Sequence, residues 1–471
     1  MIPVVTATLS SEIFLPKNEV DAQLAEFIAK NLAFANPRIG ELLRLGYSIW
    51  RVPKKIICYR SSSKGYHLPL GFGPCLRQFI TGRGQQLVLD DQRAEIATVP
   101  VVSKIKLKAP QEKVLPQLLK LHRCILEARP GFGKTMMGIE VLARRGQQTL
   151  IIVHTRALLN QWHKRLSDFC TLLPDGIGII GEGKWQLGSQ VTIAMYQTLL
   201  SRGTKSIAKK FGLVIVDECH HVPANTFSKI VKSFASKYCL GLSATPYRKD
   251  KLDRLLNFYI GKIITTQMVE SSCPHSLLPP AKMPTTLYWR ETSVVIPDWQ
   301  DLEYTSLGTL LAVNPQRQEL ILADIMAAVA AGEKVLVLSE RVSQAVDFAQ
   351  RLQAALPKVP LALVTGQHKQ EERRQILSAV KQHHYQIMVA TGGVVGEGFD
   401  WPSVSALFLT FPFSWRGKLI QYVGRVQRLA AGKKRALVYD YLDGQMSIFY
   451  SMWRKRLTTY KELGLKIQAL S

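Results

Sequence analysis

The sequence has no cysteine pattern of the kind that builds disulfide frameworks or zinc sites. Its seven cysteines are scattered and none are spaced C-x-x-C, so we expect reduced, mostly buried thiols. It also lacks an apolar run of about 20 uncharged residues, the length that crosses a bilayer. The N-terminus "MIPVVTATLSSEIFLPKNEV" has neither the charged start nor the apolar core of a secretory signal. These absences predict a soluble protein of the cytoplasm.

Acidic residues are few compared with basic ones. The chain has 61 Lys and Arg against 35 Asp and Glu, which gives a net charge of +26 and a pI near 9.8. Such an excess indicates a polyanionic partner, because neutralising phosphates releases their condensed counterions. Charge alone also fits a ribosomal or membrane-surface protein, so a motif has to decide.

A chain of 471 residues is too long for one hydrophobic core and predicts two or three domains. From about residue 123, short apolar runs alternate with helical patterns: "RCILEA", "TLIIVH", "VTIAM", "GLVIVD" and "YCLGLS". A second series follows: "KVLVLS", "LALVT", "QIMVA", "ALFLT" and "ALVYD". Continuous apolar strands separated by helices are typical of parallel sheets covered on both faces. The sequence therefore predicts two α/β domains in tandem.

The first 105 residues differ in pattern and predict a small basic α+β domain. Residues 1–108 contain 15 basic and 8 acidic residues, a balance of +7. We expect a strand in "TATLSSEIFLPK", a helix over about 18–36, and short strands in "SIWRVP" and "KIICYR". The segment "SSCPHSLLPPAKMPTT" is rich in proline and serine and predicts a surface connection. The expected domains are residues 1–105, 106–262 and 263–471.

The stretch "ARPGFGKT", residues 128–135, follows an apolar strand and precedes a helical pattern. It matches the phosphate-binding loop G-x-x-x-x-G-K-[ST] except at Ala128, a small residue at the least demanding position. Backbone N–H groups of such a loop turn towards phosphates. We expect Lys134 to reach the β and γ phosphates and the Thr135 hydroxyl to bind Mg²⁺. The predicted nucleotide-binding loop consists of Pro130, Gly131, Phe132, Gly133, Lys134 and Thr135.

A second element is "LVIVDECHH", an apolar strand that ends in two acids. The strand places Asp217 at the carboxyl edge of the sheet, where it can hold Mg²⁺, with Glu218 beside it to polarise an attacking water. His220 and His221 have no nearby metal-ligand partners in the sequence, so we expect coupling or packing roles.

These motifs, followed by "GLSATPYRKD", "VATGGVVGEGFDWP" and "QYVGRVQR", resemble motifs I, II, III, V and VI of superfamily 2 helicases of the DEAD/H-box type, over roughly residues 106–447. The resemblance implies two tandem RecA-like domains that use ATP and Mg²⁺. It implies catalytic roles for Gln421, Arg425 and Arg428, the two arginines as fingers on the γ phosphate. It also implies that His220, Ser243, Ala244 and Thr245 couple the sites, and that Glu397, Gly398 and Asp400 contact the nucleotide.

The family has an upstream glutamine that recognises adenine. In "LKAPQEKVLPQLL" the usual spacing is disturbed, so Gln111 and Gln117 compete for this role, with Gln111 the expected nucleotide contact. The resemblance also implies a nucleic-acid track along both motor domains, where hydroxyls and amides hold phosphate oxygens independently of sequence. Its predicted residues are Thr155, Arg156, Tyr196, Gln197, Thr198, Thr365, Gly366 and Thr391.

Two basic regions add to this track. Residues 404–471 contain 12 Lys and Arg against 3 acids, including "GKKR" and "WRKR" in a predicted basic C-terminal helix. The N-terminal region offers Lys54, Lys55, Arg60 and Lys64 beside Tyr59 and Tyr66, and we expect it to grip duplex DNA or a branch point. The stretch "PDGIGIIGEGK" also fits a nuclease pattern, but six residues between Asp175 and Glu182 leave little chain for the required strand, turn and strand.

Among superfamily 2 proteins the chain looks most like XPB-like and phage branch-migration (UvsW-like) DNA helicases. The resemblance implies a protein that remodels branched DNA by fork reversal, branch migration and unwinding, with branched, forked or single-stranded DNA as its partner. We expect it to be a monomer. Such a phage-type protein would act in recombination, replication or repair, in the host cytoplasm if phage-encoded. Two alternatives stay open: an RNA helicase, and an ATP-driven duplex translocase, clamp or motor part of a restriction complex that does not unwind. A membrane partner is not expected.

Overall fold

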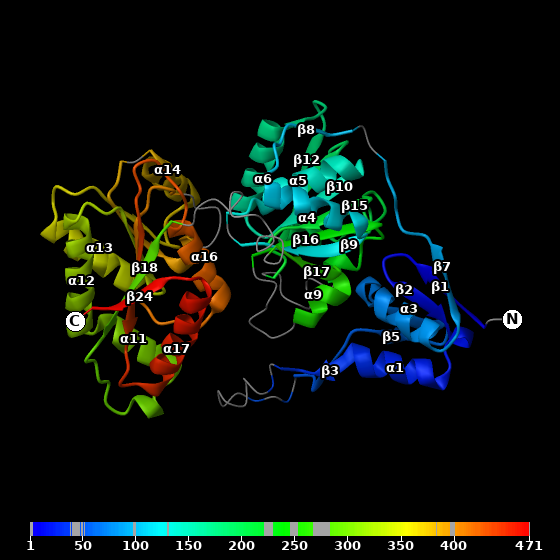
Figure 1. The fold of residues 1–471 in the computed structure, drawn as a ribbon, viewed down its shortest axis with the longest axis horizontal. Helices are drawn as coiled ribbons and strands as arrows, with labels where there is room; N and C mark the ends of the chain where they lie inside the picture. The colour runs from blue at the N-terminus through cyan, green and yellow to red at the C-terminus, as the bar shows by residue number, and fades with distance from the viewer. Residues whose placement is uncertain are drawn as a thin grey trace. The chain divides into compact units, whose positions relative to one another are not determined.

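A computed structural model of the protein shows two compact units, Met1–Leu278 and Pro279–Ser471, which we describe separately (Figure 1). The structure describes residues 3–37, 39, 48, 50, 52–97, 100–129, 131–220, 229–244, 253–266, 283–382, 384–395 and 401–470.

The N-terminal region of the first unit contains a five-stranded sheet in the order β5-β6-β2-β1-β7. Strands β1 and β7 are parallel and the other neighbours are antiparallel. A separate two-stranded pair joins β3 and β4. The elements are β1 (Val4–Leu9), β2 (Ile13–Pro16), η1 (Lys17–Glu19), α1 (Ala22–Leu32), β3 (Ala33–Ala35), β4 (Lys55–Ile57), β5 (Arg60–Ser61), β6 (Gly65–Leu68), η2 (Leu70–Phe72), α3 (Gly73–Gly82) and β7 (Gln86–Asp91).

Local chemistry corrects several boundaries expected for this region. The single predicted strand is two antiparallel strands, because the chain turns where the Ser10 N–H donates to the Glu12 carbonyl oxygen. The helix expected from residue 18 begins at Ala22, because Asp21 is its N-cap and accepts from the Leu24 N–H at 2.8 Å. Of "SIWRVP", the described residues 48, 50, 52 and 53 are not in a strand.

The first motor sheet has eight strands in the order β13-β12-β14-β10-β15-β16-β9-β17, all parallel except β13. A small antiparallel pair joins β8 and β11. The elements are β8 (Val102–Ser103), α4 (Ala109–Lys120), β9 (Arg123–Glu127), α5 (Lys134–Arg145), β10 (Thr149–Val153), α6 (Arg156–Phe169), β11 (Cys170–Thr171), β12 (Ile177–Gly181), β13 (Lys184–Trp185), β14 (Val191–Met195), α7 (Tyr196–Arg202), β15 (Leu213–Val216), β16 (Tyr238–Ser243), α9 (Asp253–Tyr259) and β17 (Lys262–Thr265).

The second unit has seven parallel strands in the order β20-β21-β19-β22-β23-β18-β24. Its elements are β18 (Thr285–Glu291), η4 (Trp299–Asp301), α11 (Tyr304–Val313), α12 (Pro315–Ala330), β19 (Val335–Ser339), α13 (Val342–Ala355), β20 (Leu361–Val364), α14 (Gln370–Lys381), β21 (Ile387–Thr391), α15 (Gly392–Val395), β22 (Ala406–Leu409), α16 (Arg416–Val426), β23 (Ala436–Leu442), α17 (Ser447–Glu462) and β24 (Lys466–Ala469).

The predicted fold class is confirmed, because both motor sheets are parallel and carry helices on two faces. Each apolar run of the two predicted series forms a strand: β9, β10, β14, β15 and β16 in the first unit, and β19 to β23 in the second. Successive strand residues point to opposite faces, so Ile151 packs in the core under α4, α5 and α6 while Ile152 packs in the core on the other face.

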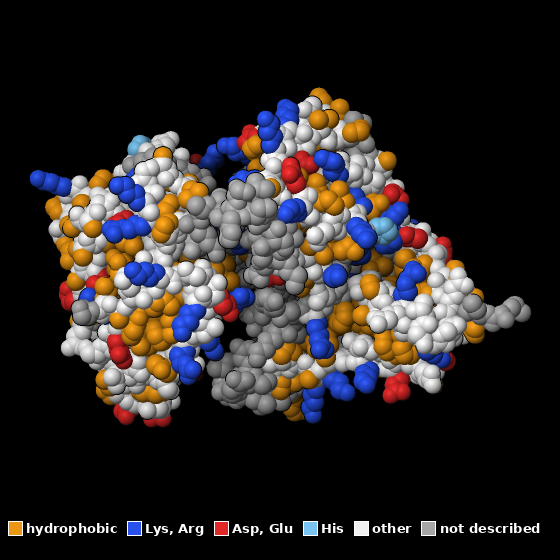
Figure 2. Space-filling view, in the orientation of Figure 1, with side chains coloured by type: hydrophobic (Ala, Val, Ile, Leu, Met, Phe, Trp, Pro, Cys, Tyr) orange, Lys and Arg blue, Asp and Glu red, His pale blue; other side chains and the backbone are white. Residues whose placement is uncertain are grey.

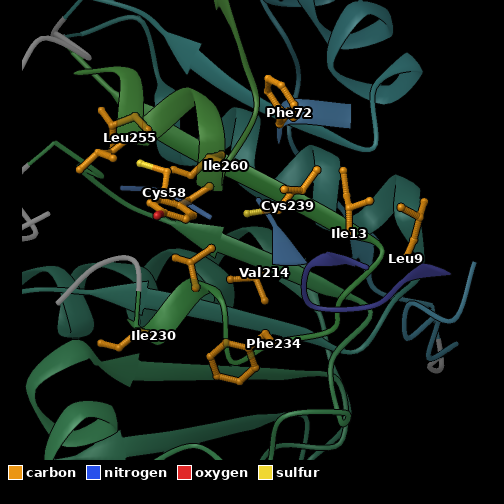
Figure 3. Packing of buried hydrophobic residues seen from close by; sticks show 14 of the residues in the cluster. Leu9, Ile13, Cys58, Phe72, Val214, Ile230, Phe234, Cys239, Leu255 and Ile260 are labelled. Carbon is orange, nitrogen blue, oxygen red and sulfur yellow. The ribbon is translucent and has the colours of Figure 1, made fainter. Parts of the chain in front are cut away.

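The N-terminal region shares that other core with the first motor sheet. Residues of its sheet and helices, such as Ile13 and Phe72, belong to one buried cluster with Val214 and Cys239 of the motor strands and Ile260 after α9 (Figure 3). The Phe72 ring meets the Phe258 ring edge-on at 6.4 Å. The N-terminal region is therefore packed onto the first motor sheet.

Gly71 marks the tightest point of this packing. A Cβ atom at this position would lie 2.0 Å from the Asn257 carbonyl oxygen and 2.7 Å from that of Phe258. Both are backbone atoms of α9, which cannot move aside as a flexible side chain can. Only glycine therefore lets η2 approach α9 this closely.

The structure of the segment with the nuclease-like pattern shows that the expectation of too short a chain was wrong. Strands β12 and β13 pair as a hairpin within it, so the chain is long enough for strand, turn and strand. The acids, however, have other partners: Asp175 accepts from the Ser189 hydroxyl at 3.1 Å, and Glu182 pairs with Arg156. Within the described ranges, no group of three or more His, Cys, Asp or Glu side chains is placed to hold a metal ion.

Six cysteines are described, all as free thiols; Cys75 is exposed and Cys58, Cys124, Cys170, Cys219 and Cys239 are buried. Cys273 lies outside the described residues. In the part of the chain that the structure covers, every helix is too short or too polar to cross a membrane.

Candidate nucleotide and nucleic-acid sites

The glycine loop lies between β9 and α5, at the carboxyl edge of the parallel sheet. Gly131 and Gly133 have φ of 86° and 94°, a region that side chains disfavour. Gly133 precedes the first residue of α5 and no side chain caps that helix within the described residues, so its first N–H groups are available to an anion. Ala128 is buried and its N–H donates to the Ser243 carbonyl oxygen at 3.0 Å, a place suited to a small residue.

Gln111 lies against this loop. Its Nε2 donates to the Phe132 carbonyl oxygen at 2.7 Å, and its Oε1 accepts from the Lys108 N–H at 2.8 Å. A Cβ at Gly133 would approach that Nε2 to 2.6 Å. Gln117 on the same helix is exposed. Of the two competing glutamines, the structure brings only Gln111 to the loop.

Lys134 and Glu218 face each other at the loop. Lys134 Nζ lies 3.6 Å from Glu218 Oε1 and donates to the Ala128 carbonyl oxygen at 3.3 Å. Glu218 has φ of 44°, an uncommon value for a residue with a side chain and one that concentrates at functional sites. The strand end thus directs a carboxylate at the loop lysine.

Asp217 is buried at the end of β15. Its Oδ2 accepts from Trp162 Nε1 at 2.7 Å and its Oδ1 from the Glu218 N–H at 3.0 Å. Burial, and next the negative charge of Glu218, raise the pKa of Asp217 to about 6. A nearby divalent cation would relieve both effects, and carboxylate and hydroxyl oxygens are ligands that Mg²⁺ prefers. The Asp217 carboxylate and the hydroxyl of Thr135, in the first turn of α5, therefore have the chemistry of Mg²⁺ ligands.

A chain of side chains leads from this site to the next strand. His220 Nδ1 lies 2.8 Å from the Ser243 hydroxyl and 3.5 Å from Glu218 Oε2, and all three groups are largely buried. Ala244 is buried beside them. Pro130, His221 and Thr245 lie outside the described residues, as do Glu397, Gly398 and Asp400.

The predicted nucleic-acid residues of the first unit gather at the same edge. Strands β10 and β14 are parallel neighbours, so Thr155 and Arg156 lie near the start of α7, which contains Tyr196, Gln197 and Thr198. Gln197 Nε2 donates to the His154 carbonyl oxygen at 3.0 Å. Thr155 is the N-cap of α6, accepting from the Leu158 N–H at 3.3 Å, and Arg156 is paired with Glu182.

In the second unit, the corresponding segments follow the neighbouring strands β20 and β21. Thr365 and Gly366 follow β20, and the Thr365 hydroxyl lies 3.1 Å from His368 Nδ1. Thr391 ends β21 and is buried. Gln421 and Arg425 are four residues apart on α16 and so share one face, while Arg428 follows the end of that helix.

Lys433 holds the backbone at the end of α16, a structural role that sequence reasoning missed. Its Nζ donates to the carbonyl oxygens of Val426 at 2.6 Å, Arg428 at 3.0 Å and Pro402 at 3.3 Å. It thereby satisfies carbonyl groups at the end of α16 and ties them to the segment after residue 400. Burial, and next the charge of Arg428, lower the pKa of Lys433 from 10.5 to about 8. The contacts of Lys433 could not be predicted from the charge run "GKKR", because such a run by itself indicates only an exposed face.

The C-terminal charge run is partly internal structure, which corrects its expected role in nucleic-acid contact. Arg456 of "WRKR" is 2% exposed and its Nε lies 2.7 Å from Asp440 Oδ2. Tyr460 donates to the same oxygen at 2.9 Å. Arg435 of "GKKR" is paired with Glu333. Among the described members of the two runs, Lys434, Arg454 and Lys455 are exposed, while Lys433 already donates to three carbonyl oxygens.

The glycine loop, the acids at the sheet edge and the pair of parallel-sheet units define a nucleoside-triphosphate-dependent motor of RecA-like architecture. Residues 104–248 match the family described as "Type III restriction enzyme, res subunit", and residues 318–430 match "Helicase conserved C-terminal domain". The chain belongs to the superfamily 2 helicases, which are ATP-dependent.

Known proteins similar to the chain have related descriptions. The probable helicase D10 of Escherichia phage T5 is 25% identical over 406 residues, 83% of this chain and 86% of the relative. The DNA 3'-5' translocase XPB2 of Sulfurisphaera tokodaii is 28% identical over 359 residues, 70% of this chain and 80% of the relative. The structure of S. cerevisiae Dbp5 bound to RNA and ADP BeF3 matches 78% of this chain and 90% of that chain, with 14% identity and a TM-score of 0.55, which supports the fold alone.

Proposed function

We propose that the chain is an ATP-dependent DNA helicase or translocase that remodels branched DNA by fork reversal, branch migration and unwinding. The observation that carries the proposal is the shared sheet edge, where the nucleotide-loop residues, the strand-end acids and a row of polar nucleic-acid candidates follow neighbouring strands. The relative named as a DNA 3'-5' translocase supports DNA as the substrate, and the relative named as a probable phage helicase supports helicase activity.

In this proposal each residue of the first unit has one task. Gly131, Gly133 and Lys134 hold the phosphates, and Gln111 supports the loop and contacts the base. Asp217 and Thr135 hold Mg²⁺, which neutralises charge on the phosphates when bound. Glu218 takes the proton of the attacking water, and its 3.6 Å contact with Lys134 keeps that carboxylate at the loop.

The second unit supplies Gln421 and the two arginines of the proposed reaction. A guanidinium is planar and always charged, so it suits the charge that develops on a transferred phosphoryl group. Arg425 and Arg428 are assigned this role, and Lys433 fixes the backbone at Arg428. Because these residues belong to another unit than Lys134, hydrolysis would depend on how the units move.

The N-terminal region is assigned the grip on duplex DNA or a branch point. Tyr59 and Tyr66 stack with centroids 6.3 Å apart, and Lys17 Nζ lies 4.9 Å over the Tyr66 ring, a cation missed from the sequence. Exposed Lys54, Lys55 and Lys64 lie in the same region of the chain. Arg60 is already paired with Glu12 at 2.6 Å, so it is a weaker candidate for a DNA contact than the three lysines.

The first test is hydrolysis of ATP by the full chain with single-stranded DNA, duplex DNA, a fork, a four-way junction or RNA. We expect the fork and the junction to stimulate hydrolysis most. Equal stimulation by plain duplex would favour the duplex translocase. A relative described as a putative ATP-dependent RNA helicase, from Acanthamoeba polyphaga mimivirus, is 25% identical over 344 residues; stimulation by RNA alone would select that candidate function instead.

A further inference from the structure

The indole of Trp162 joins α6 to the strand-end acid Asp217. Trp162 is 0% exposed and heads the largest fully buried side chains of the described residues. Its Nε1 donates to Asp217 Oδ2 at 2.7 Å across 55 positions of sequence. An indole N–H only donates and cannot accept, so this bond has one direction and a fixed geometry.

The indole ring is itself held in place by the helix that follows the glycine loop. A Cβ at Gly138 of α5 would lie 2.8 Å from Trp162 Cη2 and 3.2 Å from Leu242 Cδ1. The ring therefore packs directly on the backbone of α5, without room for even a methyl group. In consequence the Asp217 carboxylate is oriented by a side chain that cannot turn without disturbing α5.

Helix α6, which contains Trp162, begins at the predicted nucleic-acid residues Thr155 and Arg156. Thr155 caps α6 and Arg156 is its first residue, while Trp162 lies six positions further along the same 14-residue helix. A helix of this length moves as a unit, since its backbone bonds close every turn. Any displacement of residues 155 and 156 thus moves the donor that holds Asp217.

We propose that Trp162 is a positioning residue that couples nucleic-acid contact at the start of α6 to the orientation of the Asp217 carboxylate. The inference rests on the proposed function, which makes Asp217 a ligand of Mg²⁺. With Oδ2 occupied by the indole and Oδ1 bonded to the Glu218 N–H, the plane of the carboxylate is set from both sides. The other lone pairs are then presented in one direction. Outer partners of this kind commonly change metal affinity or activity by about 10-fold to 100-fold.

The test compares Trp162→Phe with the wild-type chain. Phenylalanine keeps an aromatic ring but loses the N–H. Trp453→Phe is the matched control, because Trp453 is also buried and its Nε1 has no hydrogen-bond partner among the described residues. Three quantities are measured: Mn²⁺ binding in the presence of ADP by electron paramagnetic resonance, KM and kcat for ATP, and the ratio of kcat with forked DNA to kcat without it.

We expect Trp162→Phe to weaken Mn²⁺ binding and to lower kcat by about 10-fold or more, with little change in KM. The stimulation ratio falls as well, while Trp453→Phe matches the wild type. Wild-type Mn²⁺ affinity and kcat in a folded Trp162→Phe protein would overturn the positioning role. An equal loss of kcat with and without DNA would overturn the coupling.

If Trp162→Phe does not fold, benzothienylalanine at position 162 decides the question, since it replaces the N–H by sulfur in a ring of nearly the same shape. The same losses are expected, and wild-type values would overturn the inference. Failure of the proposed function is seen separately, as a wild-type chain whose hydrolysis no nucleic acid stimulates. The Mn²⁺ measurement still tests the bond between Trp162 and Asp217 in that case.

Discussion

The three hydrogen bonds of Lys433 predict a pH dependence. A protonated lysine has three N–H donors, which match its three carbonyl partners, whereas the neutral amine has two. Because its pKa is lowered to about 8, wild-type kcat for ATP should fall as pH rises through about 8. Lys433→Arg stays charged and should keep its kcat there. The charged groups that act on Lys433 are Arg428 and Glu333, and Glu333 is paired with Arg435.

Exposed Lys434 supplies the control for this prediction. Lys434→Met should leave the pH profile of kcat unchanged, and Lys433→Met should lower kcat at every pH with KM nearly constant. A Lys433→Arg profile that falls in parallel with the wild type would contradict the assignment.

Lys134 and Glu218 should be required for hydrolysis but not for the fold. The side chains of this 3.6 Å ion pair are only 12% and 17% exposed. Lys134→Ala leaves the Glu218 carboxylate without its lysine and should lower the melting temperature, whereas Glu218→Gln keeps the shape of the side chain and should lower it less; both proteins should stay folded. Each should lower kcat for ATP by at least about 100-fold, because each removes a group that acts on the reacting phosphate or water. Binding of DNA, measured by fluorescence anisotropy, should persist. DNA-stimulated hydrolysis in either variant would refute the assignment.

Sequence pattern identified the side chains that lie within short motifs. Gly131 and Gly133 were predictable because a phosphate loop demands left-handed backbone there. The roles of Trp162, Lys433 and Lys17 were not, because each depends on a partner remote in sequence or on the end of a helix. The Trp162 bond spans 55 positions and the contact of Lys17 with Tyr66 spans 49.

Among the elements, the central strands buried at every position were predictable, while several strands with partly exposed positions were not. Strand β10 is buried at all five positions, which gives a continuous apolar run. Strands β17, β18 and β24 contain mixed or half-exposed positions, and β17 and β24 end their sheets. Their sequences therefore resemble loops or amphipathic segments, and only pairing with a neighbour makes them strands.

The contact between η2 and α9 predicts a large effect of one methyl group. Gly71→Ala places a Cβ against two backbone carbonyl oxygens of α9, so η2 and α9 must separate. We expect a loss of about 1–3 kcal/mol in the free energy of unfolding, measured by chemical denaturation. Gly82→Ala is the control, since a Cβ there meets no atom within 4 Å. Equal stability of the two variants would show that the contact is dispensable.

The N-terminal lysines predict selective loss of DNA binding. Lys54→Glu or Lys64→Glu should weaken binding to forked DNA and reduce the salt dependence of the binding constant, while basal hydrolysis of ATP stays at the wild-type level. Lys358→Glu, an exposed lysine of the second unit, makes the same change of charge elsewhere. Equal effects of all three substitutions would mean that net charge, rather than this surface, sets the affinity.

The net charge of +26 on the full chain predicts that its affinity for DNA depends strongly on salt concentration. Lys and Arg side chains are spread over the visible face of both units rather than confined to one spot (Figure 2). If six or more phosphates are neutralised, the affinity for DNA should fall by about 10³-fold or more between 50 and 200 mM salt. A titration of binding against salt measures this slope directly, and a slope near zero would contradict a phosphate-based grip.

The core that the N-terminal region shares with the first motor sheet limits how this protein can be recombined with its relatives. A chimera that exchanges only the first hundred residues would cut through one hydrophobic cluster and expose Val214 and Cys239 to water or to side chains of the wrong shape. A graft would have to include α9 as well, because Gly71 packs so closely on the backbone of Asn257 that no Cβ atom fits between them. An exchange of the N-terminal region that aims to change substrate preference therefore has to transfer α9 together with that region.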